Sequence, residues 1–144
     1  MMRNIDSHTH TRGESIYLDD IPVIAGTLYA ACFDSPVAHG KIISIDTSAA
    51  ESGEGVIKVL TYKDITGENQ IGGIIPDEPL FADAHVHFCG MPIALVVAET
   101  DQQARAAVKK IKVGIEPLPV ITDPREAAAK GELIIPPRTF TIGD

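Results

Sequence analysis

The sequence predicts one small domain of the α+β class, with a small mixed sheet, one longer helix and one shorter helix. Three observations support this class: the chain length, the apolar content and the order of the predicted elements. A chain of 144 residues can bury a core as one domain but is short for two. Its 44% hydrophobic and 22% charged residues are typical of a globular protein. We therefore treat residues 1–144 as a single domain and expect residues 1–9 to be flexible.

Short apolar segments bounded by glycine, proline or polar residues predict the strands. In residues 13–20, Ile16 and Leu18 alternate with polar neighbours until Pro22 ends the pattern, which predicts a short strand. Residues 24–33 are apolar but rich in small residues, as in a strand that another backbone crosses closely. The same reasoning predicts further strands at residues 41–46, 56–60, 85–88, 93–98 and 112–116.

Boundary signals predict the two helices, and residues 47–52 predict a single further helical turn. The first helix begins after Thr100, which has the capping-box spacing to Gln103. Its apolar face repeats at helical spacing through Ala104, Ala107, Val108 and Ile111. The second helix begins at Asp123, with Pro124 in its first position, and ends at Gly131.

Charge and cysteine content exclude several classes of protein. Twelve basic and twenty acidic residues give a formal net charge of −8, which opposes binding to nucleic acid. We also expect no membrane association, because no apolar run approaches the roughly 18–20 residues that span a bilayer. The start of the chain shows no signal peptide, so Cys32 and Cys89, its two cysteines, predict reduced thiols in the cytoplasm.

Two His-x-His pairs, His8 with His10 and His85 with His87, are the sharpest chemical signals. In a strand, residues two apart share a face, so each pair can present two imidazoles to one metal ion. Both pairs look like the metal-binding motif of amidohydrolases. That motif needs ligands from later strands, however, and no histidine follows His87. We expect no metal site and keep His85 and His87 as the alternative metal pair.

The remaining candidate groups have ordinary structural explanations. Cys89 directly follows His87 and Phe88, but a nucleophilic cysteine needs a base held against it, and lone cysteines are more often small buried side chains. The carboxylate pairs at residues 19–20 and 77–78 lie before a proline turn and in a long loop. Neither the dinucleotide fingerprint nor the P-loop pattern occurs. We therefore expect no catalytic and no cofactor-binding residue in this chain.

The order of several motifs along the chain is more specific than any single site. These motifs include HTRGES at 10–15, SPVAHGKI at 35–42, DEPL at 77–80, DPREA at 123–127 and PPRTF at 136–140. Together they resemble the N-terminal α/β-hammerhead domain of the molybdenum-binding subunit in the aldehyde oxidase and xanthine dehydrogenase family. The resemblance covers essentially everything from His10 to Asp144. Met91 departs from it, because the family usually has glutamine there, and Gly114-Ile115-Glu116 lacks an aromatic residue that the family favours.

The resemblance implies both a role and its limits. The parent enzyme would hydroxylate xanthine, a related heterocycle or an aldehyde with oxygen from water, using molybdopterin, [2Fe-2S] clusters and FAD. The family segments that hold molybdopterin and the catalytic glutamate lie beyond this chain, which would be structural and non-catalytic by itself. Its partners would be the remaining molybdopterin-binding domains or subunits. The motif positions expected to shape the fold or its interfaces are Gly13, Asp20, Gly26, Gly40, Asp46, Gly90 and Pro92.

Two alternatives remain open beside this interpretation. The first is a scaffold or interaction domain that docks on separate catalytic subunits, with the glycine- and proline-rich loop at residues 63–80 as the segment to test. The second is a metallohydrolase remnant that uses His85 and His87. A strand pair left uncovered by missing domains would also favour a homo-oligomer.

Overall fold

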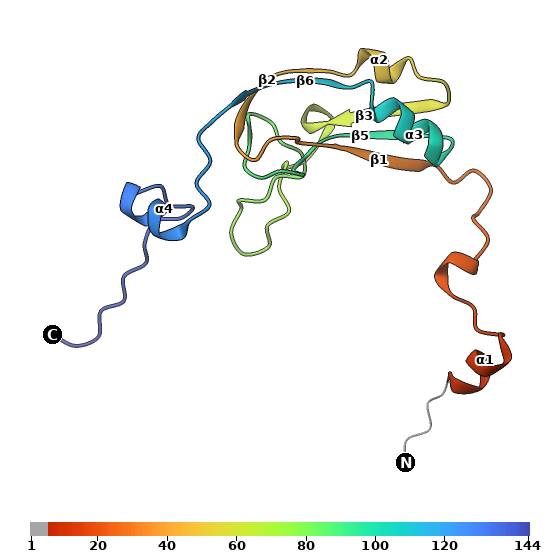
Figure 1. Cartoon of the computed structure of the whole chain (residues 1–144), viewed down its shortest axis with the longest axis horizontal. Coiled ribbons are helices and arrows are strands. Elements are labelled where there is room, and N and C mark those ends of the chain that lie inside the picture. Colours follow the sequence, from red (N-terminus) through yellow and green to blue (C-terminus); the bar gives the residue numbers. More distant parts are fainter. Residues whose placement is uncertain (1–5) are drawn as a thin grey trace.

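The strands of the chain form two three-stranded antiparallel sheets in a computed structural model that describes residues 6–144 (Figure 1). The first sheet has the strand order β1-β5-β3, and the second has the order β4-β2-β6. The elements in chain order are α1 (Ser7–Arg12), η1 (Leu18–Asp20), β1 (Tyr29–Asp34), β2 (Gly40–Asp46), α2 (Ser48–Glu51), β3 (Val56–Thr61), η2 (Tyr62–Asp64), β4 (His85–Val86), β5 (Pro92–Ala98), α3 (Asp101–Val108), β6 (Lys112–Pro117) and α4 (Pro124–Lys130).

The α+β class is confirmed, but the strands do not form the single mixed sheet that we expected. Each pairing in both sheets is antiparallel. The chain leaves β1 for β2 in the other sheet and returns to the first sheet with β3. Phe33 and Val113 pack against both clusters of buried residues, so the two sheets share a continuous core.

One face of the first sheet is covered by α3. Thr100 caps this helix by accepting a hydrogen bond from the Gln103 amide at 3.2 Å. The predicted apolar face of the helix is confirmed, because Ala104, Ala107 and Ile111 are all buried. Small alanine side chains allow the helix to approach the sheet closely, and Ala107 packs in one cluster with the inward-facing Val59, Ala94 and Val96. This packing positions the whole first sheet.

A second cluster fills the space between the loop before β4, the turn before β5 and the second sheet. Its buried members are Ala82, Val86, Met91 and Ile93. Met91, the departure from the family pattern, is 2% exposed, and its sulfur accepts a hydrogen bond from the His87 amide at 3.4 Å. Methionine therefore fills this position as an apolar core residue.

The predicted strand at residues 13–20 is wrong, as is the first part of the predicted strand at residues 24–33. In the described part of the chain, residues 6–144, no pairing strand lies beside residues 13–20. Residues 18–20 instead form η1, closed by the Tyr17 amide donating to the Asp20 carboxylate at 2.9 Å. Near Gly26 the chain turns, because the Thr27 amide donates to the Ile24 carbonyl at 3.1 Å. Local hydrogen bonds thus replace sheet pairing until β1 begins at Tyr29.

Both ends of the described chain leave the two sheets as extended arms (Figure 1). We call residues 6–28 the N-terminal arm and residues 122–144 the C-terminal arm. Residues 1–5 of the segment expected to be flexible lie outside the described residues, whereas residues 7–9 belong to α1. Helix α4 has the predicted Asp123 cap and Gly131 end. Within residues 6–144, none of the helices has the length and apolar character needed to cross a bilayer.

Candidate functional site

The predicted glycines have clear backbone roles. Gly13, Gly26 and Gly90 have φ angles of 69°, 86° and 91°, a backbone region that residues other than glycine rarely adopt. Gly40 is instead required by close packing, because a Cβ atom there would lie 2.5 Å from Ile115 Cγ2 and 2.9 Å from the Glu116 carbonyl oxygen. These positions shape turns and sheet contacts and hold no reactive group.

The predicted carboxylates are engaged in local hydrogen bonds. Asp20 closes η1, as described above. Asp46 accepts hydrogen bonds from the Ser48 hydroxyl at 2.6 Å and the Ser48 amide at 3.1 Å. The Ser48 hydroxyl and then the Ser48 amide lower the pKa of Asp46 because they stabilise its charged form. Pro92 begins β5 opposite Asp34, where the register shifts. None of these residues faces a concave site.

The first histidine pair does not lie on a strand, so its predicted geometry is wrong. His8 and His10 belong to α1, and residues two apart on a helix do not face each other. The His10 Nδ1 atom lies 2.6 Å from the Ser15 hydroxyl, and its ring stacks on Tyr17 with 6.0 Å between centroids. This histidine therefore ties α1 to the following turn.

The second histidine pair is joined by a third imidazole that the sequence did not indicate. The ring centroids of His85 and His87 are 6.3 Å apart, and so are those of His39 and His87. The His39 Nδ1 atom lies 2.7 Å from the carbonyl oxygen of Pro119 and tethers the chain after β6. Among residues 6–144, no group of three or more His, Cys, Asp or Glu side chains is placed to hold a metal ion.

Cys32 and Cys89 are free thiols at exposed positions. The expected burial of a lone cysteine is therefore wrong for both. Cys89 donates to the Ser35 carbonyl at 3.6 Å. Partial burial, and secondarily the charge of Asp34, raise the pKa of the Cys32 thiol. A raised pKa disfavours the nucleophilic thiolate at neutral pH.

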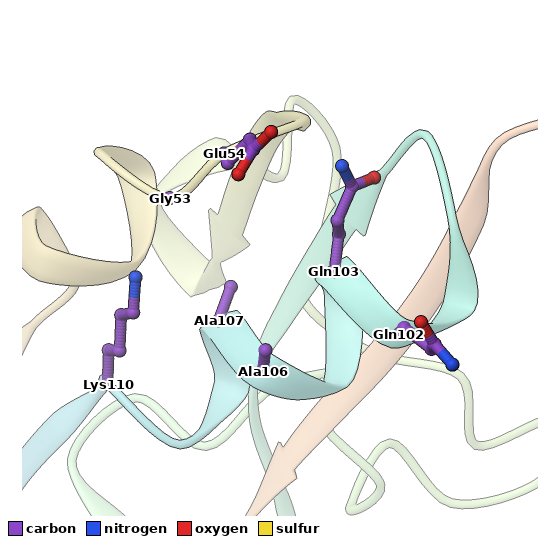
Figure 2. Close-up of a pocket in the computed structure, with 7 residues that line it drawn as sticks. All are labelled: Gly53, Glu54, Gln102, Gln103, Ala106, Ala107 and Lys110. Carbon is purple, nitrogen blue, oxygen red and sulfur yellow. The ribbon is translucent and has the colours of Figure 1, made fainter.

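Two surface depressions are open to solvent, unlike the clefts that enclose most small ligands. One, of about 340 Å³, lies at residues 122–125. The other, of about 330 Å³, lies between α3 and the turn after α2 (Figure 2). In Figure 2, Lys110 extends toward the α2 side of the depression, while Gln102 points away from its centre. Gln103 has a packing role, because its side chain occupies the space that a Cβ atom on Gly55 would need.

The first sheet has a second face, opposite α3, that none of the helices within residues 6–144 covers. Strand register places Cys32 beside Leu95, and Leu95 beside Leu60. One step along, Ala30 lies beside Val97. Leu60, Leu95 and Val97 are half-buried and belong to neither core cluster, while Ala30 and Cys32 are exposed. We call these five residues the open face.

Sequence reasoning missed the open face, although a signal for it was present. Strand β5 is apolar at every position from Ile93 to Ala98. Such a continuous apolar run is typical of a strand covered on both faces. In this structure α3 and the core bury one set of these residues, which leaves Leu95 and Val97 half-buried.

The two arms carry a second set of uncovered apolar side chains. On the N-terminal arm, Ile16 is 77%, Leu18 is 82% and Ile24 is 81% exposed. On the C-terminal arm, Ile134 and Phe140 are 97% and 86% exposed. Where such side chains form a contiguous patch, they are typical of a docking surface. The fold and these surfaces define a small α+β domain with exposed apolar side chains on both arms.

Comparison with known proteins identifies the family of this module. Residues 12–119 match the family model described as the aldehyde oxidase and xanthine dehydrogenase a/b hammerhead domain. The chain is 44% identical over 124 residues to xanthine dehydrogenase 1 of Arabidopsis thaliana, a match that spans 86% of this chain and 9% of that protein. The chain belongs to the aldehyde oxidase and xanthine dehydrogenase family and forms its α/β-hammerhead domain.

A bacterial relative and a solved structure agree with this assignment. The chain is 38% identical over 122 residues to a probable xanthine dehydrogenase subunit of Bacillus subtilis, covering 85% of this chain and 16% of that protein. The aldehyde oxidoreductase structure from Desulfovibrio gigas matches with a TM-score of 0.76 and 37% identity, over 88% of this chain and 15% of that one. The chain thus spans 9–16% of the length of the curated relatives it matches.

Proposed function

We propose that this chain is the structural, non-catalytic hammerhead module of a xanthine dehydrogenase-type molybdenum hydroxylase in the cytoplasm. Its partners are the remaining molybdopterin-binding domains or subunits of that enzyme. The parent reaction is the hydroxylation of xanthine, a related heterocycle or an aldehyde with oxygen from water. The single observation that carries this proposal is the uncovered apolar surface of the two arms, combined with the family membership.

The residues of this chain do not fit the cofactors that the family implies. A [2Fe-2S] cluster takes four cysteine ligands, and the sequence contains two cysteines. At the depression beside α4, the Asp123 carboxylate already accepts hydrogen bonds from the Arg125 and Glu126 amides at 2.7 Å and 3.4 Å. Arg125 also lines this depression, but a phosphate group of molybdopterin or FAD would meet the Asp123 carboxylate in place of free amides. The proposal therefore assigns cofactor binding to the partner domains.

A domain replacement in the Bacillus subtilis relative tests the proposal. Residues 12–119 of this chain would replace the matching segment of that protein, and the purified enzyme would be compared with the unmodified relative. We expect the chimera to retain bound molybdenum and xanthine oxidation within about tenfold of the relative, a barrier change of about 1.4 kcal/mol. The isolated chain should oxidise no xanthine.

Either of two results would contradict the proposal. The first is substantial xanthine oxidation by the isolated chain, which would place an active site in it. The second is a chimera that neither assembles nor retains molybdenum, while the same exchange made with the Arabidopsis thaliana segment retains both.

A further inference from the structure

We propose that the open face of the first sheet is an interface, and that its occupant is an apolar surface of the remaining parent enzyme. This inference rests on the proposed function. It specifies which part of the fold contacts the remaining parent enzyme. The open face consists of Ala30, Cys32, Leu60, Leu95 and Val97, as defined above.

Strand alternation separates the open face from the residues that serve the core. Ala31, Val96 and Val59 are aligned across the three strands and belong to the face toward α3, where Val96 and Val59 are buried. The next aligned set, Cys32, Leu95 and Leu60, therefore points to the opposite side. The open face thus consists of apolar side chains that the folding of this chain alone covers only in part, with Leu60, Leu95 and Val97 half-buried and Ala30 and Cys32 exposed.

The edges of the open face carry charge, as the rim of a protein interface does. Asp34 ends β1 at one side. Lys58 lies beside Val97 in β3 and forms an ion pair with Asp64 at 3.3 Å. The two small residues on β1, Ala30 and Cys32, leave room beside Leu95 and Val97 for larger apolar side chains of an occupant.

Three observations favour the remaining parent enzyme over a second copy of this chain as the occupant. The chain spans 9–16% of its curated relatives, so most of the polypeptide that can supply a cover lies outside it. The formal charge of −8 makes two copies repel each other. The N-terminal arm also runs directly into β1, and Leu28 at this junction is 46% exposed. A partner that binds the N-terminal arm is therefore also placed next to β1 and the open face.

Cys32 provides a probe of this interface in the protein itself. We would measure its modification by N-ethylmaleimide at pH 8 in the isolated chain and in the chimeric enzyme described above. Peptide mass spectrometry would distinguish Cys32 from the other cysteines, and Cys89→Ser would remove the second thiol of the chain. We expect modification to be at least tenfold slower in the chimera than in the isolated chain. Urea-unfolded chimera should react at the full rate.

A matched pair of charged substitutions provides the second arm of the test. Val97→Lys places an ammonium group on the open face, whereas Ala106→Lys places one on the exposed side of α3. We expect both isolated chains to fold, as judged by circular dichroism. In the chimera, Val97→Lys should reduce the yield of assembled, molybdenum-containing enzyme at least tenfold, and Ala106→Lys should not.

The possible results separate the interface from the proposed function. Equal Cys32 modification in the isolated chain and in an assembled, active chimera would overturn the interface and leave the proposed function in place. If Cys32 of the isolated chain becomes protected from N-ethylmaleimide as the protein concentration rises, the occupant is a second copy of the chain. That result would also overturn the proposed interface with the parent enzyme. A chimera without these substitutions that fails to assemble, while the same exchange made with the Arabidopsis thaliana segment assembles, would overturn the proposed function and this inference together. If Val97→Lys does not fold, the rates of Cys32 modification in the isolated chain and in the chimera decide whether the open face is an interface.

Discussion

The side chain of Asn69 makes two hydrogen bonds with the backbone of Phe81, twelve residues further along the chain. Asn69 Nδ2 donates to the Phe81 carbonyl at 2.7 Å, and the Phe81 amide donates to Asn69 Oδ1 at 3.0 Å. Between these two residues, the Ile71 amide donates a hydrogen bond to the Glu78 carbonyl at 2.8 Å. The long loop before β4 is therefore closed at its base, while Ile74 near its tip is 98% exposed.

Replacing Asn69 tests whether this closure orders the loop. Asn69→Ala removes both hydrogen bonds and leaves two half-buried backbone groups of Phe81 without partners. We expect a loss of about 1–3 kcal/mol in the free energy of unfolding and faster hydrogen exchange through residues 69–81. Glu68→Ala, at the exposed neighbouring position, is the control and should change neither quantity. Unchanged exchange in Asn69→Ala would show that other contacts close the loop.

Gly40 allows β2 and β6 to approach each other, and an added methyl group there should be costly. In Gly40→Ala, the new Cβ atom would meet Ile115 Cγ2 and the Glu116 carbonyl oxygen, which must move apart. We expect a loss of about 1–3 kcal/mol, typical of overpacking, measured by urea unfolding. Gly67→Ala is the matched control, because no atom lies within 4 Å of its added Cβ. Equal stability of the two variants would contradict the packing role of Gly40.

Local sequence signals predicted the helices that begin at a capping residue and the strands that glycine, proline or polar residues bound. Thr100 and Asp123 cap their helices as expected, and β2, β3, β5 and β6 lie within about two residues of their predicted positions. Alternation alone misled at residues 13–20, because Ile16 and Leu18 face no partner strand and remain exposed. The division into two sheets also escaped prediction, since it depends on which strands pair across long sequence separations.

The candidate surface was less predictable than the fold. Composition and spacing drew attention to the histidine pairs, yet His8 and His10 lie on a helix. Cys32 acquires its significance from its alignment with Leu95 and Leu60, which only the strand register shows. An interface is made of ordinary apolar residues, so no motif distinguishes them from the core until the fold shows which of them stay partly exposed.

Asp64 should make the stability of the domain depend on acid pH. The amide of Thr61 donates to its carboxylate at 2.9 Å, and Lys58 lies 3.3 Å away. The hydrogen bond from the Thr61 amide is the largest cause that lowers the pKa of Asp64, and the nearby Lys58 lowers this pKa further. A lowered pKa stabilises the fold fully above the unfolded pKa of about 3.9, and this contribution disappears as the pH falls through the folded pKa.

Urea unfolding at pH 6 and at pH 3 would check this dependence. We expect Asp64→Asn to be less stable than the native chain at pH 6, with a smaller difference at pH 3, where the native carboxylate takes up its proton. Lys58→Met, which removes only the ion pair, should reproduce a minor part of the effect. A difference between Asp64→Asn and the native chain that stays constant over this pH range would contradict the assignment.

Native mass spectrometry would decide whether His85 and His87 bind a metal ion. Their rings lie 6.3 Å apart, no third ligand is placed with them among residues 6–144, and the nearby His39 has one ring nitrogen engaged at the Pro119 carbonyl. Two imidazoles alone leave half of a tetrahedral zinc site to water, which gives weak binding. After incubation with zinc and buffer exchange, we expect the 15.4 kDa mass of the bare polypeptide or a multiple of it. One zinc per chain that is retained in His8→Ala and lost in both His85→Ala and His87→Ala would instead establish the metal site.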